Sequence, residues 1–338
     1  MRMTVGEARA LAEGVMAALG HAAAEARLIA DHLIDCELRG LHYGGLPRAL
    51  SIAERIGRDG RSRDPIRVLH ETPLSARLDG GDQLGYLVAH QATRLAIAKA
   101  LSAGIAVVGA SNTWYTGMLS YYAEMAAAEG LVSIIASHTA PWVAPYGASE
   151  GRFGTNPICF GFPTANDPII WDIGTSAIIH AQATLARRMG EALPDGVAFD
   201  GAGRPTRDPA AALAGAFAAW GGHKGSGLGL VVQLLGGLAG APFVPSDLSR
   251  FGFFMLALQP NLLGPADAFK AGAAEYATYV RAARPVEGGP VVRTPFDRSR
   301  EERRERLRRD AIEIEDDLYT ALVAVAERRS AAAQRINP

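Results

Sequence analysis

Apolar residues recur at helical spacing through the first part of the chain, residues 4–57. One face of the pattern carries Leu28, Ile29, Leu33 and Ile34. Thr4 is followed three residues later by Glu7, the arrangement of a capping box in which each residue satisfies a backbone amide of the other. The pattern predicts helices over 4–57, the first beginning after Thr4.

Further along the chain, short apolar runs bounded by Gly, Pro or Ser alternate with longer segments of helical periodicity. The expected strands are 66–71, 104–111, 131–138, 158–163, 168–173 and 251–260. The expected helices are 83–103, 118–129, 177–190, 224–239 and 265–284. Acidic and basic residues alternate at helical spacing over 297–331, which predicts a solvated helix with internal ion pairs. Strands that alternate with helices favour an α/β fold.

Composition narrows the classes of partner. The chain has 338 residues, 49% of them hydrophobic and 20% charged, with a formal net charge of -1, which is ordinary for a globular protein and gives no field that attracts nucleic acid. Cys36 and Cys159 are too few for a disulfide framework, and the histidines show no metal-ligand spacing. The apolar run 230–241 is short and broken by glycine, so no membrane span is expected. We therefore expect a cytoplasmic protein with a small-molecule substrate, without metal, nucleic acid or membrane as partner.

Three segments carry the strongest chemical signal: GTNPICFGFP (154–163), PIIWDIGTSA (168–177) and GGHKGSGLGL (221–230). Gly-rich turns let backbone N–H groups approach a phosphate, and Lys224 places a cation beside them. Asp172 ends a strand and could accept hydrogen bonds from ribose hydroxyls; the alternative is a cap for a helix beginning at Thr175 or Ser176. The alternative for Lys224 is a surface lysine. Neither the Rossmann G-x-G-x-x-G fingerprint nor a Walker P-loop is present, so a nucleotide site here is of another kind.

In order and spacing these segments resemble the type-2 malate/L-lactate dehydrogenase family, whose members use a nicotinamide cofactor without a Rossmann domain. The resemblance implies that NAD(P)H binds at positions matching the family's strand, its Gly-x-x-Lys-Gly turn and a later turn. Those positions are Ile169, Ile170, Asp172, Ile173, Gly174, Thr175, His223, Lys224, Phe296, Asp297 and Arg298. Phe296 stands where the family has a glycine.

The segment ELRGLHYGGLPRAL (37–50) resembles the family's N-terminal motif, in which Leu-Arg-Gly precedes Ser-His-Gly and an arginine. Arg48 matches that arginine, whose guanidinium suits a substrate carboxylate. In register, the Ser-His pair falls on Tyr43 and Gly44, so the histidine that donates the proton is absent. A second motif, Asn-His before an aromatic residue, is here Asn112-Thr113-Trp114. The substrate-binding residues implied are Arg48, Thr113, Trp114, Thr155 and Asn156.

A substitute proton donor has to come from elsewhere in the sequence. We expect Tyr43 to be the donor, because its phenol can donate a proton to an oxyanion, and His138 is the second candidate. Together with Arg48, these two residues form the expected catalytic set. His180 and His42 are further histidines; His42 adjoins Tyr43 but would point about 100° away if the segment were helical. The alternative for each of these side chains is a structural one, in the core or on the surface.

The resemblance also implies an architecture and a function. We expect a helical substrate-side domain from 1–75 with 290–338, and an NAD(P)-binding domain over 76–289 around a largely antiparallel sheet, in a homodimer. The expected function is NAD(P)H-dependent reduction of a carboxylate-bearing C=N or C=O bond, with an atypical proton donor. The alternative is a redox-inactive cofactor-binding or scaffolding protein derived from such a dehydrogenase.

Overall fold

The computed structural model describes residues 1–246 and 248–334. The chain forms two compact units. Residues 1–63 belong to the first together with the segment from residue 297 onward, and residues 64–296 make up the second. The unit boundaries thus fall near residues 63 and 297.

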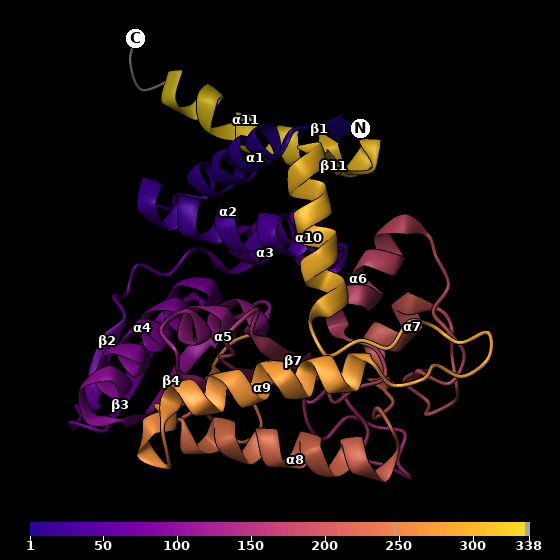
Figure 1. The fold of residues 1–338 in the computed structure, drawn as a ribbon. Coiled ribbons are helices and arrows are strands. Elements are labelled where there is room, and N and C mark those ends of the chain that lie inside the picture. The colour runs from indigo at the N-terminus through magenta and orange to yellow at the C-terminus, as the bar shows by residue number, and fades with distance from the viewer. Residues whose placement is uncertain (247, 335–338) are drawn as a thin grey trace. The chain divides into compact units, whose positions relative to one another are not determined.

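The first unit is built from helices contributed by both ends of the chain. Its elements are β1 (Arg2–Met3), α1 (Val5–Ala18), α2 (Ala23–Leu38), η1 (His42–Gly44), α3 (Leu46–Asp59), α10 (Asp297–Arg309), β11 (Ile312–Glu313) and α11 (Asp316–Gln334). Helix α11 packs against α1 and α3, and α10 packs against α2, as the indigo and yellow ribbons of Figure 1 show. The expected capping box is confirmed: Thr4 Oγ1 accepts from the amide of Glu7, and the Glu7 carboxylate accepts from the amide of Thr4.

The C-terminal segment differs from the single solvated helix expected over 297–331. Two helices form instead, and the break between them begins near Asp310. The φ of Asp310 is 45°, in the left-handed region, so the regular helix α10 ends there. Arg303 Nε donates to Asp35 Oδ1 at 2.6 Å, and Arg306 donates to the backbone carbonyl of Glu37, so α10 is tied to α2. Charges at helical spacing predict a helix but do not show which of them a neighbouring helix will bind.

The second unit is organised around a seven-stranded sheet of order β2-β3-β4-β10-β5-β6-β7. All neighbouring strands are antiparallel except β3 and β4, which confirms the largely antiparallel α/β fold. The strands of the sheet are β2 (Arg67–Glu71), β3 (Ser75–Leu84), β4 (Ile105–Trp114), β5 (Val132–His138), β6 (Ile158–Phe162), β7 (Ile169–Ile173) and β10 (Phe251–Leu258). The other elements of the unit are α4 (Gly85–Ala103), α5 (Leu119–Ala128), α6 (His180–Met189), β8 (Ala198–Phe199), α7 (Pro209–Ala214), β9 (Ala216–Phe217), α8 (His223–Leu238), η2 (Pro260–Leu262) and α9 (Ala266–Arg281).

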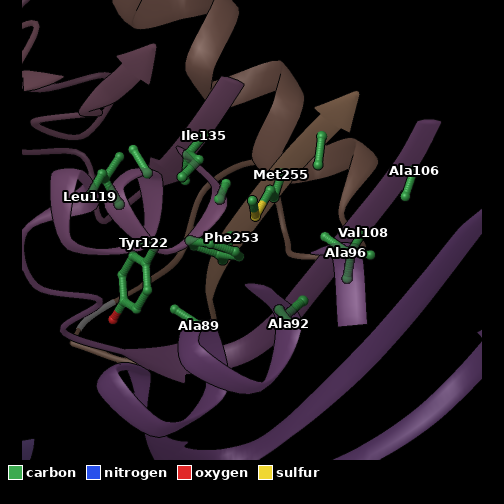
Figure 2. Close-up of a cluster of buried hydrophobic side chains, with 14 of the residues drawn as sticks. Ala89, Ala92, Ala96, Ala106, Val108, Leu119, Tyr122, Ile135, Phe253 and Met255 are labelled. Carbon is green, nitrogen blue, oxygen red and sulfur yellow. The ribbon is translucent and has the colours of Figure 1, made fainter. Parts of the chain in front are cut away.

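The main core lies between this sheet and helices α4 and α5. Along β10, Phe253 and Met255 point toward a cluster that includes Ala92 of α4 and Leu119 of α5 (Figure 2). Phe254 alternates to the opposite face, where it joins a cluster with Val232 of α8. The period-2 alternation of strand side chains therefore places helices on both faces of β10.

Strand β3 is the one strand of the seven-stranded sheet that the sequence pattern fails to predict. Its residues DGGDQL are polar and Gly-rich and give no strand signal, and the pattern places the start of the next helix two residues too early. Ala76 and Leu78 nevertheless alternate into the core, and β3 pairs with both β2 and β4. Pairing on both sides satisfies the backbone of a segment whose side chains give little strand signal.

Candidate functional site

The three segments 154–163, 168–177 and 221–230, two of them Gly-rich turns and one mainly a strand, meet in the second unit. The carbonyl of Thr155, in the GTNP loop, accepts a hydrogen bond from the amide of Thr175, just after β7, at 3.0 Å. The carbonyl of Thr175 in turn accepts from the amide of Trp220, just before α8, at 2.9 Å. Two backbone hydrogen bonds thus join the loop, the end of β7 and the turn that opens α8.

The Asn156 side chain connects these segments through hydrogen bonds. Its Nδ2 donates to the carbonyl of Gly229 and to Gln233 Oε1, both at 2.7 Å, and its Oδ1 accepts from the amide of Thr139 at 3.2 Å. The side chain is fully buried, and its φ of 38° lies in the left-handed region that asparagine tolerates. These contacts argue against the expected substrate-binding role of Asn156. Thr155 is also buried, and its amide donates to Thr139 Oγ1.

The N-terminus of α8 is the part of the assembly that is open to a ligand. Gly221 and Gly222 have φ of 62° and 63°, and His223 and Lys224, the first two residues of the helix, are exposed. The N-cap Gly222 provides no side-chain hydrogen bond to the first-turn amides. A Cβ at Gly225 would overlap the carbonyl of Trp220, so only glycine permits this tight entry into the helix. Uncapped amides beside a lysine favour an anionic group, and these residues fit the phosphate of a dinucleotide.

Asp172 on β7 holds the N-terminus of another helix. The amide of Ser120, in the first turn of α5, donates to Asp172 Oδ2 at 2.7 Å. The cap alternative is therefore right in kind, but the helix is α5 rather than one beginning at Thr175 or Ser176. Burial raises the pKa of Asp172 from its ordinary 3.8 to about 6, although hydrogen bonds from Ser120 and Leu119 act in the opposite direction.

The remaining β7 positions divide between the two faces of the sheet. The side chain of Ile170 is buried in the main core, whereas Ile173 packs on the cluster that contains α8. Ile169 is half-buried, and a Cβ at Gly174 would lie 3.2 Å from the Ile179 side chain. Since β7 is the last strand of the sheet order, one edge of its backbone has no partner strand among the described residues.

Thr113 and Trp114 end β4 with their polar atoms already bonded. Thr113 Oγ1 donates to the carbonyl of Gln83 at 2.8 Å, and Trp114 Nε1 donates to the carbonyl of Asp82 at 3.0 Å. Both side chains are buried. They anchor the end of β3 to β4, which argues against the substrate contacts that we expected from them.

His138, the second candidate donor, is also a structural residue. Its Nδ1 accepts from the amide of Gly252 at 2.8 Å, and its Nε2 donates to the carbonyl of Pro242 at 2.9 Å. The ring is fully buried, and burial lowers its pKa. With both nitrogens bonded to backbone, the ring has no proton to offer a substrate. His180 begins α6 and stacks on Trp142, with 4.3 Å between ring centroids.

Phe296, Asp297 and Arg298 lie where the second unit ends and α10 begins. Asp297 is paired with Arg300, and Arg298 with Glu302, each at 2.7 Å. Phe296 has a φ of 76°, a conformation that glycine adopts readily and a bulky residue rarely does. The backbone at this position is thus one that suits the glycine of the resembling family.

In the first unit, Tyr43 and Arg48 lie on the turn that joins α2 to α3. Tyr43 is in η1 and half-buried, and Arg48 is the third residue of α3. The residue that sequence reasoning missed is Glu37, near the end of α2. Its side chain is buried, Oε2 meets His42 Nδ1 and Oε1 accepts from the amide of Leu46, each at 2.6 Å. A single acidic residue in a helix gives no signal of such a role.

Metal-ion and membrane chemistry find no support among the described residues. Within the ranges 1–246 and 248–334, no group of three or more His, Cys, Asp or Glu side chains could hold a metal ion. No helix of that part of the chain is both long enough and apolar enough to cross a membrane.

Solved structures with the same fold are dehydrogenases and reductases. A dehydrogenase from Sinorhizobium meliloti superposes with a TM-score of 0.89 at 31% identity, covering 96% of this chain and 98% of that one. Delta1-piperideine-2-carboxylate reductase from Pseudomonas syringae superposes with a TM-score of 0.82 at 28% identity, covering 96% and 99%. The fold and its Gly-rich assembly thus define an oxidoreductase outside the Rossmann class.

Sequence relatives identify the family. The malate/L-lactate dehydrogenase model matches residues 3–323, and the chain belongs to this family. L-sulfolactate dehydrogenase from Methanothermobacter thermautotrophicus is 29% identical over 96% of both chains. Ureidoglycolate dehydrogenase (NAD(+)) from Escherichia coli K12 is 32% identical over 89% of both. Delta(1)-pyrroline-2-carboxylate/Delta(1)-piperideine-2-carboxylate reductase from Pseudomonas putida is 35% identical over 70% of both.

Proposed function

We propose that the protein is an NAD(P)H-dependent oxidoreductase that reduces a carboxylate-bearing C=N or C=O bond of a cyclic 2-imino acid or a 2-oxo acid. The relatives named above act on sulfolactate, ureidoglycolate and pyrroline-2-carboxylate, each of which carries a carboxylate. The proton donor of this chain is atypical, because the family's histidine position is occupied by Gly44.

One observation carries the proposal: two Gly-rich turns and the strand end between them converge beside the uncapped N-terminus of α8. In the proposed site the first-turn amides and Lys224 hold a phosphate, while the unpaired edge of β7 and the turn at Phe296 supply further contacts. The cofactor, when bound, supplies the hydride. The protein's own contribution is binding, orientation and the proton.

We assign the substrate carboxylate to Arg48. It lies in the first turn of α3, where the positive end of the helix dipole adds to the charge of the guanidinium.

We further propose a homodimer. Helix α8 exposes an apolar stripe at i, i+4 and i+8, formed by Leu230, Leu234 and Leu238, and each of these side chains is at least 53% exposed. Phe243 and Val244, shortly after the helix, are also exposed. A contiguous apolar surface of this kind is typical of an interface in an oligomer.

Cofactor binding is tested by replacing Lys224. We expect Lys224→Gln to raise the Kd for NADPH or NADH about ten-fold or more in a fluorescence titration, since a charge-assisted contact contributes roughly 1.5–3 kcal/mol. Lys270→Gln, on α9, is the matched control and should leave the Kd unchanged. Equal affinity in the wild type and the Lys224 variant would contradict the placement of the phosphate.

Turnover is then measured against a panel of 2-oxo acids and cyclic 2-imino acids. Oxidation of the bound cofactor by any member supports the proposed reaction. Tight binding without oxidation by any substrate would favour the redox-inactive alternative, and failure to bind either nicotinamide would overturn both.

A further inference from the structure

The turn at residues 42–44 holds a histidine against a buried carboxylate. The Glu37 side chain is 2% exposed, whereas that of His42 is 51% exposed. Glu37 Oε2 meets His42 Nδ1 at 2.6 Å, and the other oxygen is held by the amide of Leu46 at 2.6 Å. One ring nitrogen is thus fixed by the protein, and Nε2 has no hydrogen-bond partner among the described residues.

The surrounding backbone is shaped to hold this carboxylate. A Cβ at Gly45 would overlap the Glu37 side chain, so glycine is required where the carboxylate passes the chain. The Leu46 amide belongs to the first turn of α3, whose dipole favours a negative charge. A buried carboxylate held by two hydrogen bonds is a rigid partner that fixes both the orientation and the tautomer of an imidazole.

Charged groups from two helices face His42. The hydrogen bond from Glu37 of α2 raises the pKa of the imidazole above its ordinary 6.5; partial burial lowers it, and the Glu37 charge raises it further. From α10, the charge of Arg306 lowers the pKa and that of Glu302 raises it. The net direction of the His42 pKa is upward, which favours the protonated ring.

We propose that His42, oriented by Glu37, is the general acid that replaces the histidine absent at position 44. This inference rests on the proposed function and deepens it by naming the donor. Tyr43, the donor expected from the sequence, lies in the same turn and is the competing candidate.

For a 2-oxo acid, a bound dihydronicotinamide would supply a hydride to the substrate carbonyl carbon, and the π electron pair would move to the carbonyl oxygen. That oxygen takes the proton from Nε2 of the imidazolium, so the products are a 2-hydroxy acid, the oxidised nicotinamide and a neutral imidazole. In the reverse direction the neutral ring is the base. Glu37 takes no part in the proton transfer and positions the ring.

The decisive experiment compares His42→Gln, Glu37→Gln and Tyr43→Phe in 2-oxo acid reduction over pH 5–10, with His70→Gln as the exposed-histidine control. We expect His42→Gln to lower kcat about 10²–10⁴-fold, the usual contribution of a general acid, with an unchanged Kd for NAD(P)H. The wild-type rate should fall as pH rises past the His42 pKa, and this limb should vanish in His42→Gln. A phenol donor would lose its proton only near pH 10.

A second measurement does not depend on turnover. In an NMR titration of the unliganded protein, Glu37→Gln should lower the pKa of the His42 ring, while His70→Gln leaves it unchanged. A His42 pKa indifferent to Glu37 would overturn the dyad, and full activity with an unchanged pH profile in His42→Gln would overturn its role as acid while leaving the proposed function intact. Absence of wild-type turnover on the whole panel would overturn the proposed function and the acid role together.

Discussion

At the scale of single residues, the turn after α2 requires a residue without a side chain at position 45. Gly45 lies against the buried Glu37 carboxylate, and a Cβ there would overlap three of the Glu37 side-chain atoms. Because Glu37 also bonds the amide of Leu46, the carboxylate cannot withdraw without leaving that amide unsatisfied. The small residue and the buried charge therefore form one structural feature.

We expect Gly45→Ala to destabilise the fold by about 1–3 kcal/mol, the usual cost of forcing a group into a packed site. Urea unfolding measures the change. Gly57→Ala is the matched control in the same helix, because a Cβ there meets nothing within 4 Å. The control should be stabilising by about 0.5–1 kcal/mol through helix propensity alone, and equal effects of the two variants would refute the packing argument.

At the scale of elements, a side chain of β7 fixes the start of α5. Asp172 accepts the amide of Ser120, and Cys159 of β6 is its partner across the sheet. Burial raises the pKa of this carboxyl to about 6, so the folded state binds a proton more tightly than the unfolded chain, where the value is near 3.8. Folding stability from this group is therefore present at low pH and is lost as pH rises from about 4 to about 6.

The Asp172→Asn variant should remove that pH dependence. The amide oxygen can still accept from Ser120 but carries no charge to desolvate, so we expect the free energy of unfolding of the variant to gain on the wild type as pH rises through this window. Thermal unfolding at several pH values gives the measurement, with Asp267→Asn on α9 as an exposed control. A constant difference between pH 4 and pH 7 would show that Asp172 does not titrate there.

At the scale of the whole molecule, we assign two roles to helix α8. Its N-terminus is the proposed anion site, and its exposed leucine stripe is the proposed dimer contact. Two parts of the same helix thus connect the proposed cofactor binding with the proposed dimer.

We expect Leu234→Glu to convert a dimer into a monomer, since a buried unpaired charge at an interface costs several kcal/mol. Sedimentation equilibrium reports the mass directly. Leu101→Glu, an exposed leucine on α4, is the control and should leave the mass unchanged. A wild-type protein that sediments as a monomer at all concentrations would refute the dimer itself.

Most of the longer helices, and all strands of the seven-stranded sheet except β3, could be predicted because their signals are local. Periodicity located the helix that became α8 to within one residue at each end, and Thr4 with Glu7 marked the first helix start. Strand β3 was missed because partner strands, rather than its own side chains, stabilise it. The break near Asp310 was missed because the alternation of charge continues through it.

The site could be predicted only in part, for a related reason. The Gly-rich segments were found because glycine marks backbone that must approach something closely, and the structure does bring those segments together. The roles of individual side chains were harder to assign. Asn156, Thr113 and His138 are polar residues at motif positions, yet hydrogen bonds within the fold occupy them.

The sequence by itself determined the family, most of the larger elements and the absence of a histidine at position 44, because each of these follows from residue type and spacing. Only the tertiary structure decided which polar groups remain available for chemistry. Availability depends on the partners that folding supplies: Gly252 and Pro242 bond both nitrogens of His138, while Glu37 bonds one nitrogen of His42 and leaves the other. Burial and hydrogen bonding are properties of the packed chain, and they separate a structural histidine from one that can donate a proton.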